Sequence, residues 1–194
     1  SIYYNIDTLH SAISAGVQII FQYFEWMLDF SSQQRIQKRY RRDGALYQVS
    51  PWALTWDDEN YYMVAYDSAS NSIRHYRVDK MEHISLTTQT REGQQLFRDR
   101  FNIASYSRKV FGMFSGEEKT VRLQCENRFI GVIRDRFGTD LMVQKLDEEH
   151  FAVNVTVAVS PQFFSWVFGL GGAIRIMEPA DVRAAFQQQL HDMI

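Results

Sequence analysis

Clusters of turn-forming residues divide the first part of the chain into segments that are too short for long helices. These clusters are rich in Asp, Asn, Ser and Gly and lie at residues 42–44, 57–60 and 67–72, with a polar loop expected at 29–34. The segments between them carry apolar and aromatic residues that alternate with polar ones, which is typical of strands. We therefore expect five strands, at residues 17–26, 35–40, 46–56, 61–66 and 73–78.

Five short strands joined by tight turns favour a small barrel, because closure removes the exposed edges that an open sheet leaves. A short amphipathic helix is expected before them, since apolar residues recur at helical spacing and Gly16 then stops the helix. These apolar residues are Ile6, Leu9, Ala12 and Ile13. The first part of the chain is thus expected to be a helix followed by a small β-barrel.

The second part of the chain follows a different pattern, in which strands alternate with helices. It begins at residue 119, after a polar and mixed stretch at residues 86–118 that we interpret as a linker with some helix. Strands are expected around Val121, Leu123 and Cys125 and at residues 141–146, 150–158 and 173–177.

Three helices are expected between and after these strands. Asn127 is expected to cap the first, whose apolar face would hold Phe129, Ile130, Ile133 and Phe137. Ser160 followed by Pro161 is a good start for the second, which should end at Gly169. Pro179 opens the last helix, with inward positions at Val182, Ala185, Phe186 and Leu190. The resulting βαββαβ order plus a helix is the ferredoxin-like pattern.

Composition limits the classes of protein to which this chain can belong. The formal net charge is −2 over 194 residues, so any anion site must be a local patch rather than a general field. Cys125 is the single cysteine, which excludes an internal disulfide and fits a reducing compartment. No apolar run reaches the length of a membrane span, and Asp7 and His10 interrupt the apolar residues that a signal peptide would need. We expect a cytoplasmic protein without a membrane partner, and because Ser1 stands in place of a starting Met, we expect a further segment upstream.

The chain shows no set of residues that would support catalysis. Its five histidines lack the close spacing of metal ligands, and Cys125 lies in phase with Val121 and Leu123, as a buried apolar residue would. The glycine-rich run at residues 169–172 looks like a phosphate-binding loop, but it ends a helix and leads into a strand. A dinucleotide-binding loop instead follows a strand and opens a helix. We therefore predict no enzymatic activity, no metal and no cofactor.

Basic residues and aromatic rings are interleaved in the predicted barrel. One group of cations comprises Arg35, Lys38, Arg39, Arg41 and Arg42, and a second comprises Arg74, His75, Arg77 and Lys80. Between and beside them lie the rings of Tyr23, Tyr40, Trp52, Tyr62, Tyr66 and Tyr76. Cations beside stacking rings are what a groove for nucleic acid or a nucleotide needs. The same pattern also fits cations that face water and rings that fill the barrel.

Residues 17–84 resemble the WYL domain of bacterial transcription regulators. The resemblance rests on the order and spacing of four segments, residues 19–23, 47–54, 61–66 and 74–81. The tripeptide that names the family, Trp-Tyr-Leu, is Tyr61-Tyr62-Met63 here, and Lys80 stands where the family usually has Arg, which keeps the charge but loses the planar fork. Residues 119–191 resemble the WCX extension that follows WYL domains. The winged helix-turn-helix that usually precedes them is absent from this chain.

The resemblance implies an α+β chain with an Sm-like, SH3-type β-barrel followed by a ferredoxin-like domain. The implied parts are a helical connection from the missing helix-turn-helix at 1–16, the WYL barrel at 17–85, a linker at 86–118 and the WCX-like domain at 119–194. Such a chain would sense an effector, with single-stranded nucleic acid or a nucleotide-like anion as the suspected ligand, and DNA would bind to the missing head. The alternatives are a small-molecule sensor without a nucleic acid role and a purely structural dimerisation unit.

The ligand patch of the family maps to Tyr23, Ser50, Arg74, His75, Arg77 and Lys80. Further candidates for stacking or for a basic patch are Tyr62, Tyr76, Arg35, Lys38 and Arg39. Arg77 alternates with Tyr76 and Val78, so it should point out of the barrel beside His75 and Asp79. It would either pair with Asp79 or present its planar fork to an anion, and we expect the second arrangement.

The aromatic residues of the helix that starts at Pro161 bear on the oligomeric state. Phe163, Phe164, Trp166 and Phe168 make this helix apolar nearly all round. A helix of that kind is buried on more than one side. We therefore expect residues 119–194 to contribute to a homodimer.

Overall fold

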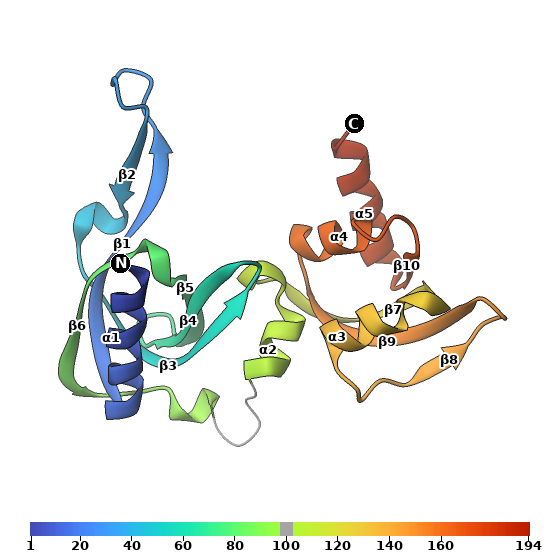
Figure 1. Ribbon diagram of the computed structural model, residues 1–194, viewed down its shortest axis with the longest axis horizontal. Coiled ribbons are helices and arrows are strands. Elements are labelled where there is room, and N and C mark those ends of the chain that lie inside the picture. Colours follow the sequence, from blue (N-terminus) through green and yellow to red (C-terminus); the bar gives the residue numbers. More distant parts are fainter. Residues whose placement is uncertain (98–102) are drawn as a thin grey trace. The chain divides into compact units, whose positions relative to one another are not determined.

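The chain folds into two compact units, Ser1–Ile103 and Ala104–Ile194. A computed structural model describes residues 1–97 and 103–194 (Figure 1). Residues 98–102, which belong to the predicted linker, lie outside the described residues. Each unit combines helices with an antiparallel sheet, so the α+β class predicted from the sequence is confirmed.

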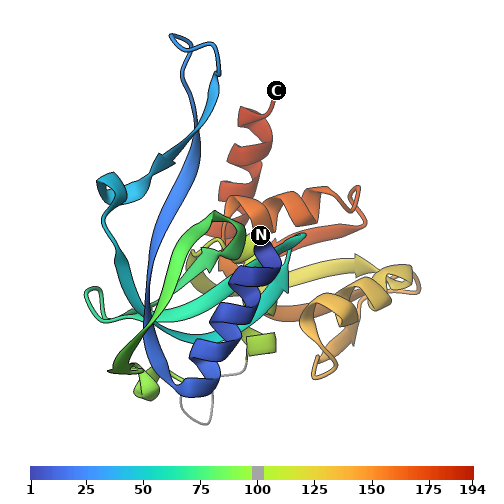
Figure 2. The ribbon, with the colours of Figure 1, turned by 60° about the vertical axis from the view of Figure 1, so that its left-hand side comes forward.

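The first unit is built on a curled antiparallel sheet that forms a half-barrel. Its elements are α1 (Ile2–Ala15), β1 (Val17–Leu28), β2 (Ile36–Tyr40), β3 (Tyr47–Asp57), β4 (Asn60–Asp67), β5 (Ser72–Arg77) and β6 (Met81–Thr90). The strand order is β2-β1-β3-β4-β5, and β6 also pairs with β1. Strand β1 pairs with β3 and β6 through its first half and with β2 through its second half. The β1–β2 hairpin therefore extends beyond the rest of the sheet (Figure 1, Figure 2).

Strand β6 is not part of the predicted pattern, in which a linker starts at residue 86. Only Met81 and Ile84 of this strand are buried, so its side chains lack the alternation that would mark it. Its backbone nevertheless pairs with β1, from Val17 opposite Thr90 to Tyr23 opposite Met81. The prediction of a linker is therefore wrong for residues 86–90, because backbone pairing holds a strand whose side chains are polar.

The core of the first unit includes helix α1 as well as the sheet. Leu9 and Ala12 of this helix are fully buried among the apolar side chains of the strands. The side-chain amide of Asn5 donates hydrogen bonds to the carbonyl oxygens of Val78 and Met81, at 3.1 and 2.9 Å. The predicted helix is therefore present, but it is a packed part of this unit rather than a connection alone.

The segment after β6 covers the other face of the sheet. Gly93 lies so close to Tyr66 that a Cβ atom on the glycine would stand 2.3 Å from the tyrosine ring. Trp52 of β3 stacks on Phe97 at 4.8 Å, and the guanidinium carbon of Arg91 lies 3.8 Å from the centre of the Trp52 ring. Residues 91–97 therefore cover the face that carries Tyr66.

The second unit contains a four-stranded antiparallel sheet in the order β10-β7-β9-β8. Its elements are α2 (Ile103–Lys109), β7 (Glu117–Glu126), α3 (Ile130–Phe137), β8 (Val143–Lys145), β9 (His150–Val159), α4 (Pro161–Phe168), β10 (Ile174–Glu178) and α5 (Ala180–Asp192). From β7 onward this is the predicted order of strands and helices. Val121, Leu123 and Cys125 of β7 are fully buried, as their alternation predicts, and pack in one core with Phe163 and Val182 of helices α4 and α5.

The starts of two helices test the capping predictions. The hydroxyl of Ser160 accepts a hydrogen bond from the backbone N–H of Phe163 at 3.2 Å, and Pro161 is the first residue of α4, as predicted. Asn127 does not cap α3, because its side-chain amide donates to the carbonyl oxygen of Glu148 at 3.0 Å. A short 3-10 helix, Asn127–Phe129, precedes α3 instead.

Two predicted core positions are wrong. On α3, Ile133 is buried and Phe137 packs against the core, whereas Ile130, at the start of the helix, is 44% exposed. On α5, Ala185 is exposed although it was expected to face inward. Only a narrow stripe of α5 at Val182 and Phe186 packs against the core of the second unit.

Candidate functional site

Four aromatic rings from three strands form a cluster in the core of the first unit. Phe21 and Tyr23 come from β1, Tyr47 from β3 and Tyr76 from β5. Their ring centres lie 5.2 to 6.3 Å apart, and each side chain is at most 8% exposed. We call these four residues the tyrosine cluster. Because the rings fill the space between the strands, a ligand can approach only the rim of the cluster in this conformation.

Arginines approach this rim. The guanidinium carbon of Arg41 lies 5.5 Å from the centre of the Tyr23 ring, but Arg41 pairs with Glu25 at 3.5 Å, whereas Arg42 and Arg74 have no such partner among the described residues. The guanidinium carbon of Arg42 lies 3.8 Å from the centre of the Tyr47 ring. Burial, and to a smaller degree Asp67, raises the pKa of Tyr76 to about 12, while the nearby positive charges of Arg42 and Arg74 act against that rise. Neither arginine forms an ion pair with a described residue. The rim therefore carries positive charge that is available to an anion.

The position of Arg42 depends on a left-handed turn. Arg42 and Asp43 have φ angles of 54° and 53°, and Gly44 follows with φ 84°. Left-handed conformations are uncommon for residues that carry a Cβ atom. The side-chain amide of Gln22 holds the turn against β1 by donating to the carbonyl oxygen of Gly44 at 2.7 Å. The sequence indicates a turn and a run of cations here, but no local pattern shows that Arg42 reaches Tyr47.

Tyr23 and Arg77 are brought together through a backbone contact. The backbone N–H of Arg77 donates to the Tyr23 hydroxyl at 2.9 Å, which joins β1 to the end of β5. Burial raises the pKa of Tyr23. The neighbours Tyr76 and Val78 are buried, as the alternation predicts. The Nε and Nη2 atoms of Arg77 donate to the carboxylate of Asp79 at 3.0 and 2.7 Å, so an anion would have to compete with this ion pair.

His75 and Tyr62 lie on the sheet face opposite Tyr76. Burial, with a smaller effect of Arg74, lowers the pKa of His75 to about 4, so its ring is neutral at neutral pH and adds no positive charge to a patch. Tyr62 and Tyr76 are 7% and 8% exposed, so neither ring presents a face for stacking in this conformation.

Ser50 and Lys80 are not brought to the rim by any contact in the described structure. Ser50 is 2% exposed, and its hydroxyl accepts a hydrogen bond from the backbone N–H of Glu92 at 2.9 Å. It pairs with Tyr66 in the register of β3 and β4, on the side that residues 91–97 cover. Lys80 is half-buried at the end of the 3-10 helix Val78–Lys80.

The predicted patch residues of β2 are engaged by other side chains. Lys38 forms an ion pair with Glu82 at 2.6 Å, and the Nε atom of Arg39 donates to Glu25 at 3.0 Å. The guanidinium carbon of Arg35 lies over an aromatic ring of the β1–β2 hairpin, 5.4 Å from the ring centre. These three cations therefore belong to the hairpin and its neighbours rather than to the rim of the tyrosine cluster.

Exposed aromatic surface lies on this same hairpin. Trp26 is 56% exposed, and the ammonium nitrogen of Lys38 lies 5.8 Å from the centre of its ring. An exposed ring beside a cation is suited to stacking on a nucleobase. Sequence reasoning places Trp26 in a strand but not among the stacking candidates, because alternation does not show which side of a protruding hairpin stays uncovered.

The two units match two known domain families. The family model of the WYL domain matches residues 4–86, and that of the WCX domain matches residues 117–194. The chain carries a WYL domain followed by a WCX domain. The resemblance noted in the sequence is thus confirmed for both domains. WYL and WCX domains are regulatory sensor domains, so this chain is a regulatory module of the ligand-sensing type.

This WYL–WCX chain spans only about a quarter to a half of the length of the solved structures that it resembles. Proteasome accessory factor B/C (PafBC) of Arthrobacter aurescens is 19% identical over 98% of this chain and 26% of its own length, with a TM-score of 0.38. A CRISPR Cas-related protein is 12% identical over 99% of this chain and 51% of its own length, with a TM-score of 0.51, which shows a shared fold. No curated protein matches the chain.

The tripeptide that names the WYL family lies in strand β4. Tyr61 is 37% exposed, whereas Tyr62 and Met63 are buried. Tyr61 packs edge-on against Trp56 across the β3–β4 hairpin, with ring centres 4.8 Å apart. In this WYL domain the tripeptide therefore contributes mainly to packing.

The described residues offer no metal site. Among them, no group of three or more His, Cys, Asp or Glu side chains could hold a metal ion. Burial raises the pKa of Cys125 to about 12, so the thiol stays protonated, and its predicted buried apolar role is confirmed. Within the described ranges, no helix is both long and apolar enough to cross a membrane. The chemistry that the WYL domain offers is a positively charged rim above a filled aromatic core.

Proposed function

We propose that the WYL domain binds single-stranded nucleic acid or a nucleotide-like anion and thereby regulates a bacterial helix-turn-helix transcription regulator. The observation that carries this proposal is the pair Arg42 and Arg74, two guanidinium groups without an ion pair to any described residue, at the rim of the tyrosine cluster. A guanidinium group presents parallel N–H donors that match the oxygens of a phosphate. The rim therefore suits a phosphate group.

Arg77 would join this site by exchanging partners. Its ion pair with Asp79 lies near the surface, with both side chains about a third or more exposed. Ion pairs of this kind contribute about 0–1 kcal/mol, so a phosphate can displace the carboxylate at little cost. The family's ligand patch at Tyr23, Ser50, Arg74, His75, Arg77 and Lys80 remains a prediction, to which the geometry adds Arg42.

A nucleobase would stack on Trp26 rather than on Tyr62 or Tyr76, the candidates named from the sequence. Tyr62 and Tyr76 are buried, whereas Trp26 is exposed beside Lys38. A nucleic acid strand could place its phosphates at the rim and a base on the hairpin. Base–aromatic stacking contributes about 1–3 kcal/mol per base, so this interaction would raise affinity for a strand over a single nucleotide.

The larger assembly that we propose around this site follows the same family expectations. The curled sheet supports an Sm-like, SH3-type barrel for the WYL domain, and the strand order β10-β7-β9-β8 supports a ferredoxin-like fold for the WCX domain. We further propose a cytoplasmic homodimer that dimerises through the WCX domain and contacts DNA through a separate head.

Fluorescence anisotropy with a short labelled oligonucleotide tests the proposal. We expect binding at low salt, and we expect R42Q and R74Q each to weaken it about tenfold. Each variant should also reduce the log–log salt slope by roughly 0.7 for every phosphate that the missing guanidinium group would have bound. The matched control is R134Q, which removes an exposed arginine of α3 in the WCX domain. No binding at low salt, or an equally large effect of the control variant, would contradict the proposal.

A further inference from the structure

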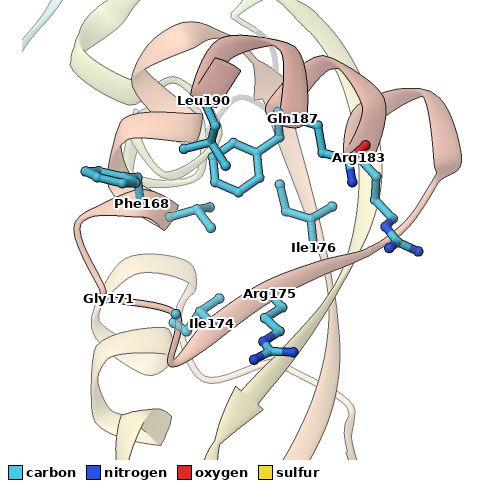
Figure 3. A pocket seen from close by; sticks show the side chains of 11 residues that line it. Phe168, Gly171, Ile174, Arg175, Ile176, Arg183, Gln187 and Leu190 are labelled. Atoms are coloured by element: carbon cyan, nitrogen blue, oxygen red, sulfur yellow. The ribbon is translucent and has the colours of Figure 1, made fainter. Parts of the chain in front are cut away.

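A cavity of about 440 Å³ lies within the WCX domain, between helix α4, strand β10 and helix α5 (Figure 3). Its size falls in the range of small-molecule sites. Its walls are almost entirely apolar, with Ile174 and Ile176 from β10, Val167 from α4, and Phe186 and Leu190 from α5. The interior therefore suits an apolar group and would leave a polar one without hydrogen-bond partners.

The glycine run after α4 keeps one side of this cavity open. Gly171 and Gly172 line the cavity and have φ angles of 66° and 85°. No atom lies within 4 Å of the position that a Cβ atom would take on either residue. The run that looks like a phosphate loop in the sequence is thus a helix stop, and the two glycines border an accessible opening.

An arginine at the edge of the cavity gives it a charge. Arg183 of α5 lines the cavity and is exposed, and Figure 3 shows its guanidinium group at the margin, away from the apolar walls. Arg175 of β10 is also exposed, but its side chain lies on the other side of the strand from Ile176 (Figure 3). Neither forms an ion pair with a described residue. Glu126, which lines a separate pocket with Arg175, binds Arg128 at 2.9 Å instead.

We infer that this cavity binds an amphipathic anion, with an apolar chain or ring inside and a carboxylate or similar head group at Arg183. The apolar walls select the body of the ligand, and the guanidinium group of Arg183 selects the sign of its charge. This site is a second ligand input, built from the WCX domain alone. It stands or fails independently of the proposed nucleic acid site.

Isothermal titration calorimetry of the full chain with sodium decanoate, below its micellar concentration, tests the inference. We expect one site per chain, and about tenfold weaker binding for R183Q, the effect expected when one charge-assisted hydrogen bond is removed. R175Q, on the other side of β10, should change binding much less. The neutral analogue 1-decanol should bind more weakly than decanoate by a similar factor. R134Q, which changes an exposed arginine of α3 outside the cavity, should leave decanoate binding unchanged.

A second pair of variants separates occupation of the cavity from general surface binding. Gln187 is exposed and lines the cavity, so Gln187→Trp should fill it and abolish decanoate binding while the protein stays folded by circular dichroism. The matched control Ala185→Trp places the same ring on an exposed position of α5 that does not line the cavity. Equal binding by both variants would overturn the inference. A second result would also overturn it. If the unchanged chain is a dimer that does not bind decanoate, and Gln187→Trp converts it to a monomer by light scattering, then a second copy of the chain covers the cavity.

Discussion

The WYL and WCX domains each place arginine side chains beside apolar ones, but only one of the two apolar regions is filled. In the WYL domain the tyrosine cluster is packed, and Arg42 and Arg74 stand at its rim. In the WCX domain the apolar walls beside Arg183 leave a cavity of about 440 Å³. A filled region offers a ligand only its charge, whereas an empty one also accepts an apolar body. Packing, rather than charge, therefore separates the two ligand classes that we propose.

The largest expected effect comes from emptying the filled region. Tyr76→Ala removes a buried ring that packs against three others in the tyrosine cluster, so we expect the free energy of unfolding to fall by about 3–5 kcal/mol, as for other large buried aromatic residues. Urea denaturation measures this decrease. Tyr61→Ala, at a 37% exposed ring, is the control and should cost roughly 1 kcal/mol or less. Similar decreases for the two variants would show that the cluster is not packed as described.

A pH titration of stability sharpens the comparison, because no histidine or carboxylate lines the WCX cavity while the WYL domain holds His75 half-buried in its sheet. Burial lowers the pKa of His75 from 6.5 to about 4, so the unfolded chain binds a proton that the folded chain resists. The contribution of His75 is present in full above pH 6.5 and is lost as the pH falls toward 4, by on the order of 3 kcal/mol at most. The pH dependence of the free energy of unfolding should be flatter for His75→Asn. An unchanged pH dependence would contradict the neutral state of the ring in the folded protein.

Measuring one arginine variant of each domain against both ligands tests whether the domains sense different ligands. Arg74→Gln should weaken oligonucleotide binding about tenfold and leave decanoate binding unchanged, and Arg183→Gln should do the reverse. Anisotropy and calorimetry on the same preparations measure both. A variant that weakens both ligands equally would indicate one shared anion site.

The smallest expected effect concerns Arg77. Because its ion pair with Asp79 lies near the surface, Arg77→Ala should change the free energy of unfolding by only about 0–1 kcal/mol. Oligonucleotide affinity should fall severalfold, and Arg77→Lys should recover part of it, since an ammonium group cannot make the forked contact. Thermal melts measure the first effect and anisotropy the second. Unchanged oligonucleotide affinity in a stable Arg77→Ala protein would contradict a contact between Arg77 and the ligand.

Local sequence patterns were sufficient for most of the elements that surround these sites. The turn clusters separated β1 to β5, Gly16 marked the end of α1, and Ser160 with Pro161 marked the start of α4. The alternation of residues 76 to 78 correctly placed Tyr76 and Val78 inside and Arg77 outside. Such signals depend on chemistry within a few residues, and a single sequence contains them in full.

Contacts between distant residues decided the rest. Strand β6 is held by pairing with β1, across about the whole length of the WYL domain, and its polar side chains carry no trace of that pairing. Arg42 reaches Tyr47 from a left-handed turn that Gln22 holds in place, and the guanidinium group of Arg77 pairs with Asp79. The sequence by itself determined most of the elements, the two domain families and the cations of the WYL domain. Whether an apolar region is filled or empty depends on how side chains from separate strands and helices meet, which only the tertiary structure shows.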